Sequence, residues 1–345
     1  MARRTKISTN SLEKLGTQKL AALILAESAH NRPFKQVVQL ALDTRDGPSS
    51  VAIGLRRRFS AIAKSRTFLE REKKREQLSE LNALHAIIVG EIGEKDAMLA
   101  LELLWKFIDL HDTVLERVDD SSGRFGAMFR ETCPDLGALA EAANANPEHL
   151  AGMVFERLMD NGYGIYDELI PIMSHALGPN GRSALRKALT QRHSELSQVE
   201  KLPHSARHYR DSESTAIKLA LRELADCEVD PDAFIATHDE RTLANPRFAA
   251  EIAHRLLAAD RANEALKFLD AAPPKTGKDS FGATEWRDAR IAVLDALDRA
   301  PEAQRLRMTA FEERLSMSHL RDYLSKLPDT EAPPAERKAL DFALS

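Results

Sequence analysis

The sequence predicts an all-α fold, an α-solenoid assembled from helical hairpins. Glycine accounts for only 15 of the 345 residues and aromatic residues for 6%, whereas Ala, Leu, Glu, Arg and Lys recur throughout. Strands draw on β-branched and aromatic residues and need frequent glycine turns, so this composition favours helices. No window shows the sustained apolar–polar alternation of a strand. The 43% of hydrophobic residues is enough for a sizeable core and excludes a disordered chain.

Turn signals divide the chain into stretches of about 12–25 residues, a spacing typical of short-loop helical arrays. We therefore expect roughly fourteen to sixteen helices. The turn signals are Asn31-Arg32-Pro33, Asp46-Gly47-Pro48, Asp119 to Gly123, Gly178-Pro179-Asn180-Gly181 and Asp230-Pro231.

The clearest single helix is predicted over residues 97–118. Apolar residues recur there at steps of three, four and seven, which places them on one stripe of a helix. That stripe consists of Leu101, Leu104, Ile108, Leu115 and Val118, and Trp105 widens it. We expect this helix to lie at the centre of the N-terminal half.

An internal repeat predicts tetratricopeptide-like units in the C-terminal part. Residues 256–265 read LLAADRANEA, and residues 294–303, 38 positions later, read LDALDRAPEA, with seven of ten positions identical. Each segment has the pattern of a helix end, a tight turn and a helix start, which is how stacked helical repeats appear in sequence. Ala258 and Ala296 are expected where the two helices of each repeat cross closely.

Two domains are predicted: residues 1–203 form an N-terminal helical array with a basic first segment, and residues 215–345 form the repeats. The polar stretch 205–214 is interpreted as the linker between them, and the stretch 271–282 as a surface loop within the repeats. The last helix, after Pro333-Pro334, has no C-cap glycine and no polar capping helix, which terminal repeats usually need.

The two cysteines, Cys133 and Cys227, are far apart and form neither a disulfide framework nor a zinc motif, which favours a reducing compartment. The most apolar early segment, Leu20 to Ala26, is flanked by Lys19 and Glu27. At seven residues it is too short for a membrane span. We therefore expect a cytoplasmic protein without a membrane segment.

Charge is distributed unevenly along the chain. Residues 1–75 contain 17 Lys and Arg against 6 Asp and Glu, whereas the other 270 residues contain 32 basic and 47 acidic side chains. A basic stripe of this kind can contact the phosphates of nucleic acid. The same residues can instead form the solvated face of a helix, paired with the acidic remainder. The candidate phosphate contacts are Arg56, Arg57, Arg58, Lys64, Arg66, Lys73 and Lys74.

No motif predicts catalysis, a cofactor or a metal. His111-Asp112 lacks the further ligands of a phosphohydrolase, so His111 is interpreted as a buried structural histidine. His204 and His208 lack the glutamate of a zinc-protease motif, and residues 119–123 lack the alternating acids of a calcium loop. Residues 275–279 lack the glycine and hydroxyl of a phosphate loop.

The most unusual segment is DNGYGIYDE at residues 160–168, where two glycines lie between two tyrosines. Glycine permits a tight left-handed turn here, and Tyr166 to Glu168 can open the next helix. A packed turn between helices is one interpretation. The other is a partner groove, with Tyr163, Tyr166 and Asp167 as the candidate binding residues.

Three regions have distinctive sequences: VDDSSGRFGAMF at 118–129, DNGYGIYDELIPIMSHALGPNG at 160–181, and EWRDARIAVLDAL with HLRDYLSKLP at 285–297 and 319–328. Together they resemble a bacterial helical family that carries the label domain of unknown function 6880. That family is similar to the helical region appended to SWIM-type zinc fingers. A SWIM finger needs CxC and CxH pairs, which Cys133 and Cys227 do not supply, so zinc binding does not carry over. The resemblance supports a helical solenoid and implies no chemistry.

The function predicted from the sequence is a non-enzymatic helical-repeat scaffold that binds another protein. Solenoids bind partners through extended surfaces built from many repeats, so no short motif reveals the partner. The alternative is a nucleic-acid-associated accessory protein that uses the basic residues of 1–75. An enzyme whose site is assembled from distant helices is the third class. A deep pocket with converging acids or histidines would indicate it.

Overall fold

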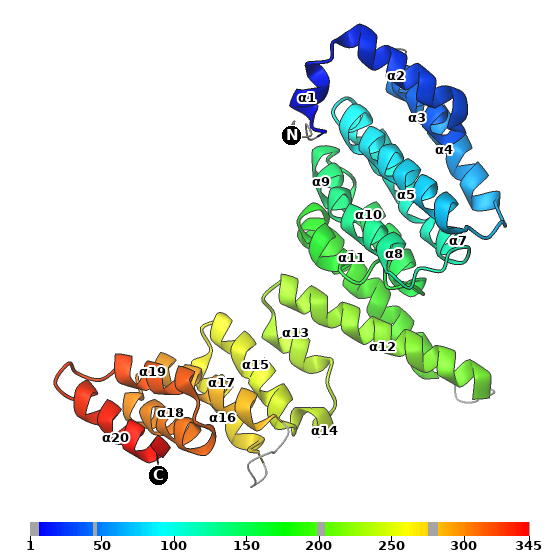
Figure 1. Ribbon diagram of the computed structural model, residues 1–345. Helices are drawn as coiled ribbons and strands as arrows, with labels where there is room; N and C mark the ends of the chain where they lie inside the picture. The colour runs from blue at the N-terminus through cyan, green and yellow to red at the C-terminus, as the bar shows by residue number, and fades with distance from the viewer. Residues whose placement is uncertain (1–6, 44–46, 199–203, 275–281, 345) are drawn as a thin grey trace, which may run out of the picture. The chain divides into compact units, whose positions relative to one another are not determined.

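The computed structural model describes residues 7–43, 47–198, 204–274 and 282–344, and within these ranges the chain is helical, with no strand (Figure 1). It divides into two compact units, Met1–Glu213 and Ser214–Ser345. Within the described ranges, no helix combines the length and the apolar character that a membrane crossing requires.

The described part of unit 1 contains eleven complete α-helices, and α5 continues directly into a π-helical segment, Ile87–Ile92. The helices are α1 (Thr9–Glu13), α2 (Thr17–His30), α3 (Arg32–Asp43), α4 (Pro48–Lys64), α5 (Arg71–Ala86), α6 (Ala97–Ile108), α7 (His111–Leu115), α8 (Arg124–Thr132), α9 (Pro134–Ala142), α10 (Pro147–Met159) and α11 (Leu169–Gln198).

The helix α12 (His204–Cys227) contains the division between the units, and unit 2 follows it. The helices of unit 2 are α13 (Pro231–Ala236), α14 (Glu240–Leu243), α15 (Pro246–Ala258), α16 (Ala262–Ala271), α17 (Ala283–Ala296), α18 (Ala300–Arg314), α19 (Met317–Ser325) and α20 (Ala332–Leu344). The described helices outnumber the fourteen to sixteen expected because α1, α7, α13 and α14 are only four to six residues long.

The core of unit 1 is built around α6, which packs against α4, α9 and the π-helical segment. Only Glu102 and Lys106 are exposed in its last eight residues, and Trp105 and Phe107 are fully buried. A helix that is apolar on nearly all sides belongs in a core, so the central position predicted for it is confirmed.

The single helix predicted over 97–118 is wrong in its length. At Asp109 and Leu110 the ψ angles are −12° and −16°, in place of about −42° in a regular α-helix, and α7 begins only at His111. The side chain of Asp109 is bound by groups from α10 and from the segment that follows it. This tertiary contact accompanies the distortion, and nothing in the local sequence signals it.

The five predicted turn signals are confirmed where they are described. Gly47 and Asp230 are N-caps that precede the prolines opening α4 and α13, and Asn31 ends α2. At Gly178 the backbone has φ 54° and ψ −173°, so α11 consists of two helical segments that meet at a kink. Glycine adopts this conformation without the steric cost that a side chain would bring.

The linker predicted at 205–214 is wrong, because these residues lie in the helix α12. The segment is polar, but His204–Cys227 contains neither glycine nor proline, so nothing in it interrupts a helix. The predicted loop at 271–282 does separate two helices, α16 and α17, and its residues 275–281 lie outside the described structure.

The helices of unit 2 pack mainly on their neighbours in the chain. The helix α15 contacts α16 and α17, α17 contacts α18, α18 contacts α19, and α19 contacts α20. Buried side chains shared by α15, α16 and α17 form the main core of this unit, including Ile252, Leu256 and Leu269.

The two halves of the sequence repeat have the same backbone geometry. Asp260 and Asp298 adopt left-handed conformations, with φ of 58° and 56°. The N–H of Arg261 donates to the carbonyl of Leu256, and the N–H of Arg299 donates to that of Leu294, which is the bond of a Schellman helix end. The 38-residue repeat therefore corresponds to a repeated helix–turn–helix junction.

The small residues at these junctions are not the ones expected. Ala258 and Ala296 are exposed, so a larger side chain at either position meets solvent rather than a neighbouring helix. The fully buried alanines of the repeat are Ala265 and Ala303, 38 residues apart. They lie in the first turn of the second helix, on the side that faces the first, and the sequence alone does not show which alanine faces inward.

Candidate functional site

The predicted binding residues lie in the turn between α10 and α11, but they have different environments. Tyr163 is 44% exposed, whereas Tyr166 is fully buried. The carboxylate of Asp167 accepts a hydrogen bond of 2.7 Å from the side chain of Asn161, within the same turn. Gly164 has φ 65°, the left-handed turn that the sequence predicts. The next helix begins at Leu169 and not at Tyr166.

Tyr166, itself buried, belongs to a polar cluster that joins this turn to α6 and α10. Its hydroxyl donates to Asp109 at 2.6 Å, and Arg157 donates to the other oxygen of that carboxylate at 2.7 Å. The guanidinium of Arg157 also lies over the ring of Trp105, 4.4 Å from its centre, a favourable cation–π contact. Burial, and then the charge of Asp109, raises the pKa of Tyr166, which therefore stays protonated.

The prediction that His111 is a buried structural residue is confirmed, since its side chain is almost fully buried. Its Nδ1 lies 2.8 Å from the carbonyl of Ile108, and its ring packs edge-on against Tyr166 and Tyr163. Burial, together with the nearby charges of Asp160 and Asp109, raises the pKa of Asp112. These contacts place His111 in the packing of the turn.

An apolar groove of about 450 Å³ lies between α6 and α10. Trp105 belongs both to the groove and to the polar cluster of Tyr166, and its indole N–H is buried without a hydrogen-bond partner. Met98, at the groove, is 50% exposed. The large apolar side chains that line the groove are Met98, Leu99, Leu101, Trp105, Leu150 and Met153.

Two helix N-termini form the polar rim of the groove. Asp96 caps α6 by accepting from the N–H of Leu99, and Asn146 caps α10 by accepting from the N–H of His149, both at 2.9 Å. Glu102 lines the groove as well and binds Lys106 and Arg56. Hydrogen bonding to Lys106 is the main cause that lowers the pKa of Glu102. The lining thus contains two carboxylates and neither lysine nor arginine.

The seven candidate phosphate contacts divide into two groups. Arg56, Arg58 and Lys74 form ion pairs with Glu102, Glu80 and Asp119, respectively. The other four are exposed and have no ion-pair partner among the described residues. They are Arg57, Lys64, Arg66 and Lys73.

The described part of the chain contains no group of three or more His, Cys, Asp or Glu residues suited to a metal. The side chains of His204 and His208 lie outside the described residues, as does the segment 275–279. Cys133 is buried, with its sulfur 3.5 Å from the carbonyls of Phe129 and Ile165. Burial raises the pKa of this thiol to about 12, which makes it an inert core residue.

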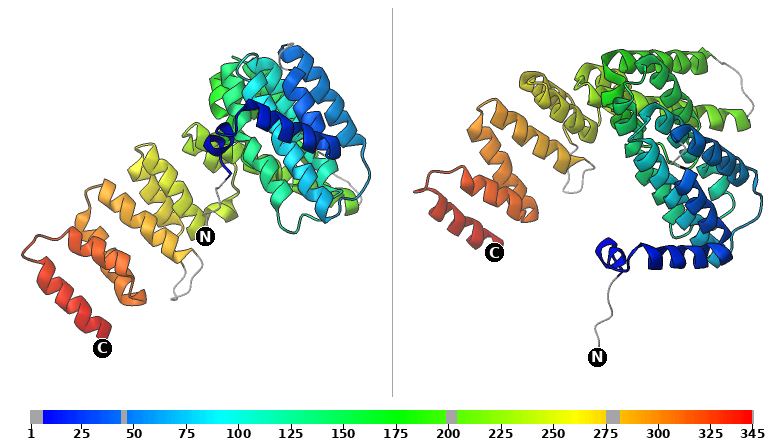
Figure 2. Two further views of the ribbon diagram at one scale, coloured as in Figure 1. Left: turned by 45° about the horizontal axis from the view of Figure 1, so that its top comes forward. Right: turned by 90° about the horizontal axis from the view of Figure 1, so that it is seen from above.

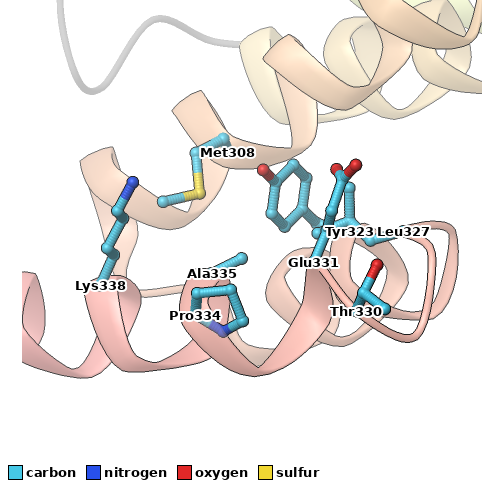
Figure 3. Close-up of a pocket in the computed structure, with 8 residues that line it drawn as sticks. All are labelled: Met308, Tyr323, Leu327, Thr330, Glu331, Pro334, Ala335 and Lys338. Carbon is cyan, nitrogen blue, oxygen red and sulfur yellow. The ribbon is translucent and has the colours of Figure 1, made fainter.

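A second hollow, of about 320 Å³, lies in unit 2 against α18, α19 and α20 (Figure 3). Met308 and Tyr323 face Pro334 and Ala335 across it, and Lys338 lies at the end away from Glu331. None of its lining residues is buried. It is smaller than the groove of unit 1.

The groove of unit 1 was not predicted from the sequence, although two of its residues, Leu101 and Trp105, belong to the predicted core stripe. The available signal was the pair of methionines, Met98 and Met153, on two predicted helices, since flexible methionines are frequent on adaptable binding surfaces. That signal does not show that the two helices lie side by side.

The described residues form an all-helical protein with an apolar groove on its N-terminal unit. The model of a family described as a family of unknown function (DUF6880) matches residues 2–345, and the chain belongs to that family. Comparison with curated proteins gave no match, and comparison with solved structures gave none either.

Proposed function

We propose that this protein is a non-enzymatic scaffold for protein–protein interaction, and that the groove between α6 and α10 is its binding site. The observation that carries the proposal is the concentration of six large apolar side chains around a groove of about 450 Å³. Apolar grooves between helices accept the apolar face of a partner helix, and methionine-rich walls adapt to its shape. Tyr163 and Asp167 lie in the turn that follows the C-terminal end of α10. The groove residue Asn146 caps the opposite, N-terminal end of this helix.

The chemistry of the groove indicates the kind of partner. An amphipathic helix with large apolar residues at positions i, i+3 or i+4, and i+7 matches the lining. A lysine or arginine next to that apolar face would lie near Asp96, because the lining has no lysine or arginine and its other carboxylate, Glu102, is already paired.

The test is selection of a phage-displayed peptide library on the full chain, followed by a comparison of the selected peptides on a Met98→Glu variant. We expect enrichment of amphipathic sequences with a basic residue beside the apolar face. Binding of a labelled selected peptide, measured by fluorescence anisotropy, should weaken at least about tenfold in Met98→Glu, because a buried methionine contact contributes about 1.5–3 kcal/mol.

The matched control for this substitution is Ile53→Glu on α4. Ile53 is 51% exposed and does not line the groove, so the peptide should bind this variant as it binds the unaltered chain. Peptides that bind Met98→Glu and the unaltered chain equally would exclude the groove as the binding site.

We also propose that the helices of unit 2 form a tetratricopeptide-like solenoid. The repeated junctions at Asp260 and Asp298 and the packing of neighbouring helices support this assignment. We further propose that the protein is bacterial and cytoplasmic, and that it is similar to the helical regions of SWIM-type zinc-finger proteins. These further proposals rest on the sequence alone.

A second candidate function is nucleic-acid association through the basic N-terminal helices. It is favoured by the four exposed cations, of which Arg57 and Lys64 lie seven residues apart and share one face of α4. The ion pairs of Arg56, Arg58 and Lys74 argue against it, because these three charges are already neutralised.

The number of free cations predicts the salt dependence of any such binding. Four phosphate contacts lower the affinity for duplex DNA about 150-fold between about 50 and 200 mM salt, whereas seven would lower it about 6,000-fold. Anisotropy of labelled duplex DNA, single-stranded DNA and RNA at these salt concentrations measures the slope. The Arg57→Glu, Lys64→Glu double variant should abolish most of the binding. If the double variant binds nucleic acid with the same micromolar affinity as the unaltered chain, the assignment to these cations is contradicted.

A further inference from the structure

The helix α2 is apolar and yet exposed along its whole length. Its central segment reads LAALILA, and none of its fourteen residues is buried. Leu23 is 54% exposed, Ile24 39% and Leu25 71%. A helix that is apolar on all sides is normally enclosed by other elements, so α2 presents a surface without its partner.

Within unit 1, α2 packs mainly against α3 and lies at the outer edge of the helices (Figures 1 and 2). The preceding segment adds Leu12, in α1, and Leu15, between α1 and α2, each 38% exposed. Six of the large exposed apolar side chains of the described chain belong to the short stretch 7–25. The exposed apolar surface is therefore concentrated here.

The charges of α2 identify the partner. Lys19, Leu23 and Glu27 lie at i, i+4 and i+8 and share one face of the helix. Leu23 is the midpoint both of the apolar segment and of the two charges. If two copies of this helix lie antiparallel with Leu23 opposite Leu23, each Lys19 faces a Glu27. This face is complementary to itself, as a two-fold symmetric interface requires.

We infer that α2 pairs antiparallel with α2 of a second copy of this chain, about a two-fold axis at Leu23. A lipid surface fits less well, because helices that lie on membranes carry a strongly basic polar face and α2 has Lys19 as its one lysine or arginine. A helix of fourteen residues is about 21 Å long, which gives a small interface, so we expect micromolar dimerisation.

Sedimentation velocity of the full chain, from about 1 to 200 µM, tests the inference. We expect a monomer–dimer equilibrium in this range. Leu23→Lys places two cations at the axis and should raise the dissociation constant of the dimer at least tenfold. Leu219→Lys, at a leucine of α12 that is 51% exposed, is the matched control and should leave it unchanged.

A charge exchange tests the register of the pair. Lys19→Glu alone brings the introduced carboxylate against Glu27 of the other copy and should weaken the dimer. Lys19→Glu combined with Glu27→Lys restores opposite charges and should restore the dimer. All of these positions are exposed, so we expect unchanged thermal stability of the monomer, which circular dichroism checks.

A chain that stays monomeric up to 200 µM would overturn the inference, and so would a dimer that Leu23→Lys leaves intact. A double variant that remains as weak as Lys19→Glu would refute the antiparallel register. These outcomes are independent of the groove between α6 and α10, because peptide binding there should be the same in Leu23→Lys.

Discussion

Replacement of Arg58 by alanine should lower the free energy of unfolding of unit 1 by about 3–5 kcal/mol. Two nitrogens of Arg58 bind the two carboxylate oxygens of Glu80, whose side chain is only 2% exposed. Gln77 donates to the same carboxylate. Without the guanidinium the carboxylate of Glu80 is a buried charge with no cation, and this is far more costly than the loss of an exposed ion pair.

Urea unfolding of the full chain measures this loss. A Trp286→Phe background leaves Trp105 as the only tryptophan, so fluorescence reports on unit 1. Arg57→Ala, at the exposed neighbour, should change the stability by no more than about 0.5 kcal/mol. The Arg58→Met, Glu80→Met pair should recover most of the loss, because both charges are then removed. Equal effects of Arg57→Ala and Arg58→Ala would show that the pair is not structural.

The second large effect is expected at Gly137, where α9 crosses α11. A Cβ atom at this position would lie 2.5 Å from the carbonyl oxygen of Ile172, which is backbone and has little freedom to move. Gly137→Ala should therefore destabilise unit 1 by about 1–3 kcal/mol or more, as overpacking does, although alanine favours the helix itself. The same urea experiment measures it.

Gly152→Ala is the control of opposite sign. Gly152 is an exposed residue inside α10, and nothing lies within 4 Å of a Cβ atom built on it. Alanine there should stabilise the protein by about 0.5–1 kcal/mol, because it restricts the unfolded chain. If both glycine variants gain stability, α9 and α11 do not approach each other as described.

Local signals in the sequence predicted the helical class and many helix boundaries. Proline and capping residues at Pro48, Asp230 and Pro231 act within a few residues of the chain, so their effect is visible in the sequence itself. The repeat at 256–265 and 294–303 predicted two turns with the same backbone, because seven shared residues reproduce the same local bonds.

Some predictions were wrong at positions whose structure depends on residues distant in the sequence. The distortion at Asp109 coincides with bonds from Arg157 and Tyr166, which lie about fifty residues further along the chain. The polar composition of 205–214 was interpreted as a linker, although only glycine or proline would have interrupted the helix.

The candidate site could be predicted only in part. The turn at 160–168 was recognisable from its glycines, but not that Tyr166 faces inward towards Asp109 while Tyr163 stays exposed. Whether an arginine is free also depends on the fold, since Arg57 and Arg58 are adjacent and only Arg58 reaches an acid. The groove needs the mutual placement of α6 and α10, which no short stretch encodes.

The neighbour-to-neighbour packing of unit 2 has a consequence for how it folds. Contacts such as those of α15 with α16, or α18 with α19, close short segments of chain, so the entropy lost in forming each one is small. Any such hairpin can start folding, and its neighbours can add to it in either direction. Loosening of α20 disturbs chiefly α19, so resistance to local opening should rise from this end of the chain towards α15.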